Sequence, residues 1–153
     1  MHPLLGFRVQ DRGDDVRPRI HFYLPFPGKA TTSMSHIVQI ETKMHDPLAI
    51  STSCRRLALK EPVQGIARLF SESVTGLLVE LPGWCFPVVI DTTSGTVRYD
   101  NYGGRWGEQR HLERLTQIYA VEKAKIEARR RGYTASERTL QDGSILVSIE
   151  VGH

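Results

Sequence analysis

The residues between Tyr99 and Trp106 form the densest concentration of potential binding groups in this sequence. They read YDNYGGRW and bring together two tyrosines, a tryptophan, an arginine, a carboxylate and an amide. Loops held by a rigid framework carry many binding side chains, and Tyr, Trp and Arg are frequent anchors of protein interfaces. We therefore take as the candidate binding site, with one histidine that follows the loop, the residues Tyr99, Asp100, Asn101, Tyr102, Gly103, Gly104, Arg105, Trp106 and His111.

The same loop has a structural interpretation that fits the sequence equally well. Asp100 and Asn101 are residue types that cap turns, and the glycine pair is suited to positive φ angles. Trp106 would then pack beneath the helix that follows. The residue types alone support both interpretations.

The reactive side chains lack the spacing of a catalytic or metal site. The potential metal ligands form no Cys-x-x-Cys pair and no His-x-x-x-His pair; they are His36, His45, Cys54, Cys85 and His111. There is no Gly-x-Ser-x-Gly elbow, and the glycine pair lacks the Lys-Ser/Thr of a phosphate-binding turn. We expect no metal and no cofactor.

These observations favour a non-catalytic protein over an enzyme. The alternative is an enzyme or small-ligand-binding protein in which the loop and a nearby histidine form one pocket. His111 lies about one helical turn into the predicted long helix, so its side chain has the reach to approach the loop. That pocket would be formed by Asp100, Asn101, Tyr102 and His111.

Hydrophobic periodicity predicts the elements that hold the loop. Alternation over residues 38–43 indicates a strand, and Asp46-Pro47 is typical of a helix start; this helix should end near Leu59. Four segments then read as strands, VQGIARLFS, TGLLVEL, FPVVIDT and TVRYD. The longest periodic segment, over residues 112–126, predicts a helix that ends at Gly132, and a hairpin through Asp142-Gly143 closes the chain.

The predicted fold class is α+β, with the order β-α-β-β-β-α-β-β. Most links between strands have hairpin length, which favours a mainly antiparallel sheet with both helices on one face. We expect a single domain over residues 34–153. Residues 1–33 contain four of the eight prolines and are predicted to be a disordered or mis-called leader, with the natural start at Met34.

Charge and composition narrow the classes of partner. Residues 1–33 carry +2 of the net charge of +3, so the predicted domain is nearly neutral and we do not expect it to bind nucleic acid. No apolar run is long enough for a membrane span, and the two cysteines, predicted to be reduced and buried, form no disulfide framework. We expect a cytoplasmic protein without a membrane association; the oligomeric state cannot be predicted.

One acidic residue and one basic run on the long helix each have two interpretations. Glu122 lies in line with the apolar stripe, and we expect it at the edge of the stripe, reaching water, since Glu is rarely fully buried. The alternative is a buried functional acid. The run Arg129 to Arg131 suits either an acidic partner or the negative end of the helix dipole.

Three segments of the chain resemble a known protein family. The segments are MSHIVQIETK, the stretch from WCFPVVIDT through YDNYGGRW to KAKIEARRRGY, and DGSILVSIEV. They are similar to a domain-of-unknown-function family that includes the hypothetical chloroplast reading frame thirty-five protein of plastids and cyanobacteria, over about Met34 to Val151. The resemblance implies no reaction and no cofactor. It implies a protein partner, because relatives often accompany an AAA-type ATPase, and so an uncharacterised accessory protein that works through protein-protein interaction.

Overall fold

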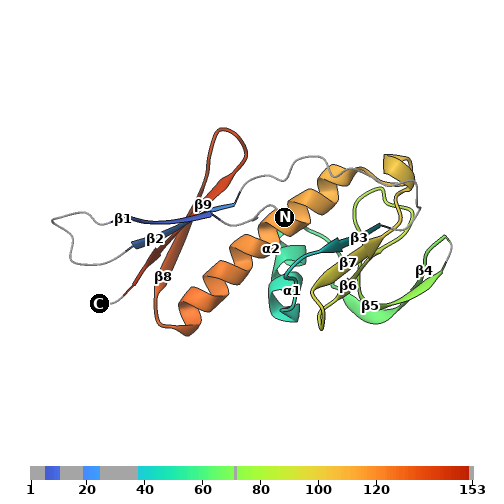
Figure 1. Cartoon of the computed structure of the whole chain (residues 1–153), viewed down its shortest axis with the longest axis horizontal. Helices are drawn as coiled ribbons and strands as arrows, with labels where there is room; N and C mark the ends of the chain where they lie inside the picture. Colours follow the sequence, from blue (N-terminus) through green and yellow to red (C-terminus); the bar gives the residue numbers. More distant parts are fainter. Residues whose placement is uncertain (1–5, 11–18, 25–37, 71, 152–153) are drawn as a thin grey trace. The chain divides into compact units, whose positions relative to one another are not determined.

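The computed structural model describes residues 6–10, 19–24, 38–70 and 72–151, which form parts of two compact units. Unit 1 comprises Met1–Pro27 together with Thr116–His153, and unit 2 comprises Gly28–Leu115. The longest helix, α2 (Gln109–Arg130), begins in unit 2 and continues into unit 1 (Figure 1). Each unit is described by itself.

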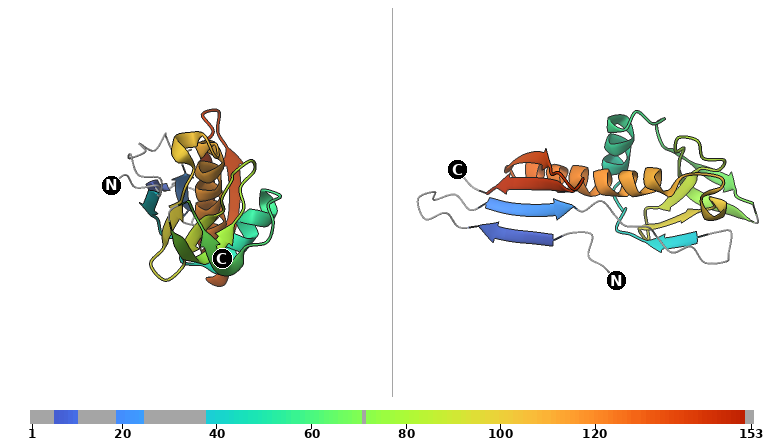
Figure 2. Two further views of the ribbon diagram at one scale, coloured as in Figure 1. Left: turned by 90° about the vertical axis from the view of Figure 1, so that its right-hand side faces the viewer. Right: turned by 90° about the horizontal axis from the view of Figure 1, so that it is seen from above.

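Unit 2 is built on a five-stranded antiparallel sheet with the order β3-β7-β6-β5-β4. Short turns connect most of its neighbouring strands, as the hairpin-length links predicted. Strand β4 is one edge of this sheet and β3 is the other (Figures 1 and 2). The strands are β3 (Val38–Glu41), β4 (Val63–Arg68), β5 (Ser73–Val79), β6 (Val88–Asp91) and β7 (Thr96–Tyr99).

Strand register divides the side chains of this sheet between two faces. Directly opposite residues of antiparallel strands share a face. Ile90 pairs with Val97, and both are fully buried in the main core. On the other face, here called the outer face, Val89 pairs with Arg98. A small second apolar cluster on this face contains Ala67, Leu69, Val74 and Val89, with Leu78 and Phe86 packed against it.

Helix α1 (Pro47–Arg56) begins as the sequence predicted. The Asp46 carboxylate accepts a hydrogen bond of 3.0 Å from the Leu48 amide, and Pro47 occupies the first turn, where its missing N–H costs nothing. The helix ends at Arg56, three residues before the predicted end. It buries Ala49, Ile50, Ser53 and Cys54.

Helix α2 ends at a glycine, as predicted. Gly132 has φ +76°, in the left-handed region that favours glycine. The amide of Tyr133 donates to the Ala128 carbonyl at 2.9 Å, which satisfies a terminal acceptor of the helix. Arg130, in the basic run, forms an ion pair of 3.0 Å with Glu127.

Unit 1 contains a second antiparallel sheet, with the order β1-β2-β9-β8. Its strands are β1 (Gly6–Gln10), β2 (Arg19–Leu24), β8 (Thr134–Thr139) and β9 (Ile145–Glu150). The alternating residues Ile145, Val147 and Ile149 are buried. Strands β1 and β2 fall within residues 1–33, where the sequence showed periodicity only over the short run from Ile20 to Leu24, and β2 pairs with β9 over six residues. The remainder of that segment, with Met34, lies outside the described residues.

The expectation that Glu122 reaches water is wrong. Glu122 is only 5% exposed, and its carboxylate lies 3.7 Å from the ammonium group of Lys125. Lys125 also contacts Glu137 of β8 at 3.1 Å. One lysine therefore contacts two carboxylates, and its positive charge helps to accommodate an acid on the apolar stripe.

The predicted α+β class and the antiparallel pairing are confirmed. The structure has four strands between α1 and α2, one in each of the four segments that read as strands, whereas the predicted order β-α-β-β-β-α-β-β counted only three. The strands also divide into two sheets. Within the described residues, no helix combines the length and the apolar character that crossing a membrane requires.

Candidate functional site

The first part of the candidate loop points inward and fixes the loop to the start of α2. Tyr99, Asp100 and Asn101 are each no more than 1% exposed. The Gln109 side-chain amide donates to the Tyr99 hydroxyl at 3.1 Å and accepts from the Asn101 amide at 2.9 Å. Asn101 also donates to the Gly107 carbonyl at 3.3 Å. Burial raises the pKa of the Tyr99 hydroxyl, which therefore stays protonated at neutral pH.

The middle of the loop is a tight turn built from left-handed residues. A single 3-10 turn, η1 (Tyr102–Gly104), has φ +47° at Tyr102, +62° at Gly103 and +97° at Gly104. The Asn101 carbonyl accepts from the amides of Gly104 and Trp106, at 3.0 and 2.9 Å. The glycines take this conformation without strain, whereas Tyr102 carries a steric cost.

Trp84 supports the loop from the side. Its indole N–H donates to the Glu108 carbonyl at 3.0 Å, and its ring meets Tyr99 edge-on at 5.7 Å between centroids. A Cβ placed on Gly107 would lie 2.4 Å from this indole, so only glycine fits there. The adjacent Cys85 amide donates to the Trp106 carbonyl at 2.8 Å. These contacts hold the two loops in one arrangement.

The second part of the loop points outward and belongs to a cluster of aromatic rings. Tyr102 stacks on Trp106, with centroids 4.6 Å apart and planes 25° apart. Trp106 also contacts Phe70 at 5.4 Å and Phe86 at 5.8 Å. The guanidinium carbon of Arg105 lies 5.3 Å from the centre of the Tyr102 ring. We call Phe70, Phe86, Tyr102, Arg105 and Trp106 the aromatic cluster.

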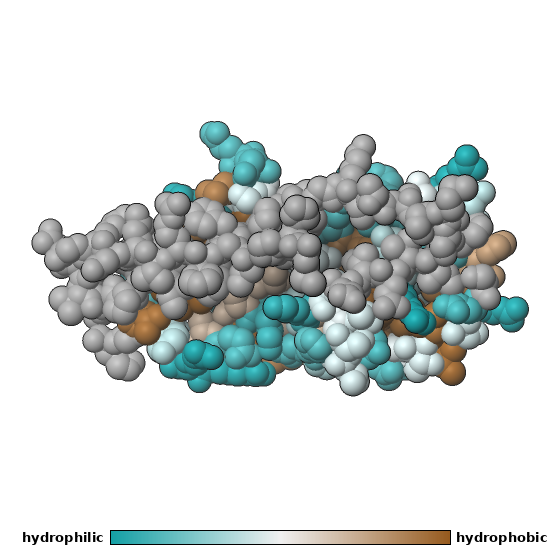
Figure 3. Space-filling view, in the orientation of Figure 1, coloured by the Kyte–Doolittle hydropathy of each residue, from teal (hydrophilic) through white to brown (hydrophobic). Residues whose placement is uncertain are grey.

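The aromatic cluster adjoins the apolar residues of the outer face. Phe86 belongs to the cluster and also packs against the second apolar cluster formed by Val74 and Val89 with their neighbours. Phe70 is 61% exposed and Tyr102 is 39% exposed. Figure 3 shows apolar surface near the β4–β5 end of unit 2. A partially exposed aromatic surface on a rigid apolar base is the arrangement that protein interfaces use at their centres.

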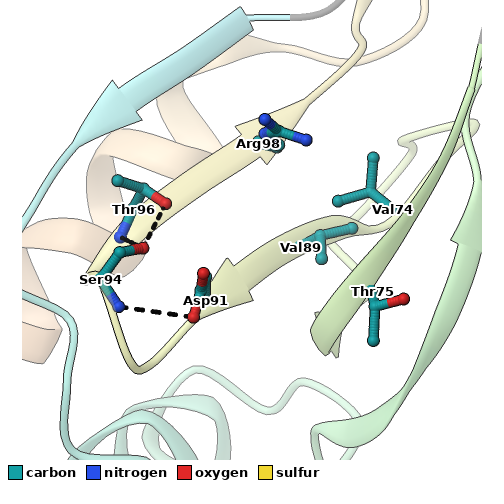
Figure 4. Close-up of a pocket in the computed structure, with 7 residues that line it drawn as sticks. All are labelled: Val74, Thr75, Val89, Asp91, Ser94, Thr96 and Arg98. Atoms are coloured by element: carbon teal, nitrogen blue, oxygen red, sulfur yellow. Dashed lines mark hydrogen bonds between the residues drawn. The ribbon is translucent and has the colours of Figure 1, made fainter.

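A shallow hollow of about 290 Å³ lies on the same outer face (Figure 4). Its polar end is the turn after β6, where the Asp91 carboxylate accepts from the amides of Thr93 and Ser94 at 3.0 and 3.4 Å. These hydrogen bonds lower the pKa of Asp91. Because the turn already uses this carboxylate, the hollow has the character of a surface depression rather than a reactive site. It is lined by Val74, Thr75, Val89, Asp91, Ser94, Thr96 and Arg98.

The residues of the alternative pocket differ in their exposure to solvent. Asp100 and Asn101 are buried, whereas Tyr102 is directed to the surface cluster. His111 is partly exposed on α2, and its ring has no hydrogen bond to a described residue. One oxygen of each buried residue, Asp100 Oδ2 and Asn101 Oδ1, has no hydrogen-bond partner among the described residues. The inward residues thus act as anchors of the loop.

The potential metal ligands do not assemble in the described part of the chain. No group of three or more His, Cys, Asp or Glu residues with the geometry to hold an ion occurs among the described residues. The Nδ1 of His45 donates to the Thr92 carbonyl at 2.9 Å, and His36 lies outside the described residues. Cys54 is buried as predicted, but Cys85 is exposed, contrary to prediction, because the loop that carries it turns its side chain outward.

Sequence inspection missed two of the five residues of the aromatic cluster. Phe70 lies next to the end of the segment read as the first strand after α1, and Phe86 begins a later one, so each was assigned only to its own strand. The signal that was present is the concentration of six aromatic residues over positions 70–106, which are Phe70, Trp84, Phe86, Tyr99, Tyr102 and Trp106. Trp106 packs against the rings of Phe70, Phe86 and Tyr102. Trp84 instead donates a hydrogen bond to the Glu108 carbonyl, just before α2.

No protein-family model, curated protein or solved structure matches this chain. The site is therefore interpreted from its own geometry.

Proposed function

We propose that this chain is a non-catalytic interaction protein that binds a protein partner through the aromatic cluster. The observation that supports the proposal best is the contact between Phe70, Phe86, Tyr102 and Trp106, with the Arg105 guanidinium over the Tyr102 ring. Trp, Tyr and Arg are the residues that most often dominate binding free energy at protein interfaces.

The way the cluster is held also supports binding. Rings whose conformations are fixed before association lose little side-chain entropy when a partner covers them. Tyr102 and Trp106 stack on one another, and the loop beneath them is anchored through Asn101 and Gln109. The partially exposed Phe70 and Tyr102 offer apolar surface that a partner would remove from water.

The partner proposed for the first test is an AAA-type ATPase. Its support is the family resemblance of segments such as YDNYGGRW, whose relatives often accompany such an ATPase. We also propose that the protein meets this partner in the cytoplasm. The alternative function, in which the loop and His111 bind a small ligand, has less support, because Asp100 and Asn101 are buried and already hold the loop.

The test is a binding measurement between the purified full chain and the ATPase of the same host. Tyr102→Asn removes a ring at a position where Asn tolerates the left-handed backbone, and Arg105→Gln removes the cation while keeping a long polar side chain. Each should weaken binding at least about tenfold, the effect expected of an interface anchor. Leu48→Ser is the matched control, since Leu48 is another exposed apolar side chain, on α1 and outside the cluster.

The outcomes separate the proposal from its competitors. Loss of binding in both cluster variants, with normal binding of Leu48→Ser, supports the proposal. Equal binding of all three variants would remove the cluster from the interface. No binding of the wild-type chain would exclude the ATPase as partner.

A further inference from the structure

Strand β4 is an edge strand that lacks the usual protection against pairing with another strand. It has one strand neighbour in the sheet, β5. Edge strands are normally kept apart by charged side chains, internal prolines or bulges. The charged residue of β4, Arg68, is the last residue of the strand, and the stretch from Val63 to Ala67 contains neither a charged residue nor a proline. Val63 is 62% exposed and Ile66 is 70% exposed, so two aliphatic side chains on this edge are largely in water.

We infer that β4 pairs with β4 of a second copy of this chain. The two strands run antiparallel around a two-fold axis perpendicular to the sheet, and the axis passes at Ile66. In this arrangement the outer face of one copy continues as the outer face of the other, because directly opposite residues share a face. This pairing uses the free edge of β4, not the aromatic cluster, and it does not depend on the ATPase.

The sequence of β4 is complementary to itself in this register. Ile66 lies opposite Ile66 of the second copy, which covers the most exposed aliphatic side chain of the strand. Gln64 lies opposite Arg68, so an amide oxygen meets a guanidinium. The Arg68 side chain has no ion pair or hydrogen bond to any described residue within one copy, and the second copy supplies an acceptor. Cross-strand pairs of these kinds stabilise sheets.

The neighbouring register is less complementary. If the axis passed at Gly65, Ile66 would lie opposite Gln64, and Arg68 would lie opposite Pro62. The aliphatic side chain would then face an amide, and the guanidinium would meet a residue without a side-chain acceptor. The axis at Ile66 is therefore the register that we propose.

The small contact between the two β4 strands limits the affinity of the dimer. β4 has six residues, and a strand pair of this length is small compared with the interfaces of permanent dimers. We therefore expect a reversible dimer that forms in the micromolar range or above. Since Phe70 is four residues from the axis, the pairing would place two Phe70 residues roughly 26 Å apart along the strands, at about 3.3 Å per residue.

The first test measures the mass of the full chain by sedimentation equilibrium, from low micromolar to near-millimolar concentration. The wild-type chain should pass from monomer to dimer. Ile66→Lys places two like charges opposite each other and should raise the dimer dissociation constant at least about tenfold. Thr75→Lys is the matched control, because Thr75 is exposed and pairs with Ile66 on β5, one strand away from the edge; it should dimerise like the wild type.

The second test fixes the register by disulfide formation in a Cys85→Ser background. Cys54 is fully buried, so the introduced thiol is the accessible one. Ile66→Cys should give a covalent dimer under mild oxidation, since residue 66 faces its own copy across the axis. Gln64→Cys should not, because its opposite residue is Arg68.

Each outcome decides the inference. A wild-type chain that stays monomeric throughout the range overturns it. A dimer that persists in Ile66→Lys places the interface elsewhere and also overturns it. Equal cross-linking through positions 64 and 66 would refute the register.

Discussion

Gly107 lies directly against the indole ring of Trp84. A Cβ at position 107 would approach the ring to 2.4 Å, which is shorter than side-chain contacts in folded proteins. The indole cannot move away without losing the hydrogen bond from its N–H to the Glu108 carbonyl. This contact joins the loop before β6 to the loop that leads into α2.

Gly107→Ala should therefore destabilise the protein by about 2 kcal/mol, the usual cost of forcing an extra methyl group into a packed site. Urea unfolding followed by circular dichroism measures the change. Gly65→Ala is the control, because a Cβ there would lie at an ordinary 3.5 Å from Leu78. If the clash is the cause, Trp84→Leu should cost less stability in the Gly107→Ala background than in the wild type.

The effect of replacing Tyr102 on the free energy of unfolding should depend on the backbone conformation as much as on the loss of the ring. Tyr102 has φ +47°, which Asn tolerates and a β-branched residue does not. Tyr102→Asn loses the stack on Trp106 but relieves strain, so its free energy of unfolding should stay within about 1 kcal/mol of the wild type. Tyr102→Val should be less stable than Tyr102→Asn. Equal stability of the two variants would show that the backbone conformation does not matter here.

Lys125 should be much more important for stability than the neighbouring Lys123. Lys125→Met removes the ion pairs that Lys125 makes with the buried Glu122 and with Glu137 and should cost about 2 to 3 kcal/mol, toward the lower end for a broken buried pair. Lys123→Met, which breaks a more exposed pair with Glu127, should cost less than about 1 kcal/mol. Differential scanning calorimetry compares the two variants.

A double variant tests whether the buried charge is the cause. Adding Glu122→Gln to Lys125→Met removes the buried negative charge that Lys125 no longer contacts, so it should recover part of the lost stability. A double variant that is less stable than Lys125→Met would contradict this explanation.

The two cysteines should differ in reactivity. Burial, with a smaller contribution from the negative charge of Glu61, raises the pKa of the Cys54 thiol to about 11. Cys54 should therefore resist iodoacetamide at pH 8 in the folded protein, while the exposed Cys85 reacts. Mass spectrometry of peptides after brief labelling identifies the modified residue, and labelling in denaturant should modify both.

The same shift makes stability depend on pH in the alkaline range. The folded protein holds the Cys54 proton more tightly than the unfolded chain, whose thiol has an ordinary pKa of about 9.0. The contribution of Cys54 to stability is therefore complete below pH 9 and decreases as pH rises toward about 11. Cys54→Ala should show a smaller loss of unfolding free energy over this interval. An identical pH dependence in both proteins would contradict the assignment.

Local sequence patterns predicted the elements whose causes are local. The Asp46-Pro47 helix start, the left-handed Gly132 and the alternation of Ile145, Val147 and Ile149 all depend on residues within a few positions. The pairing of β2 with β9 was not predicted, because it joins residues more than a hundred positions apart. Alternation shows which side chains are buried but not which strand lies alongside.

The candidate site was predicted in part for the same reason. The loop from Tyr99 to Trp106 was found from its composition, and the positive φ of its glycines followed from residue type. The division of the loop into a buried anchor and an exposed half depends on Gln109, whose amide bonds to both Tyr99 and Asn101. Phe70 and Phe86 reach Trp106 only through the folded sheet, which no local pattern reports.

The aromatic cluster draws its rings from three separate stretches of the chain: the end of β4, the approach to β6 and the turn before α2. No short peptide contains this epitope, so linear fragments of the protein should fail to compete for whatever binds it. A partner that recognises the cluster therefore binds only chains in which the sheet is folded, since a chain that loses the sheet also loses the surface.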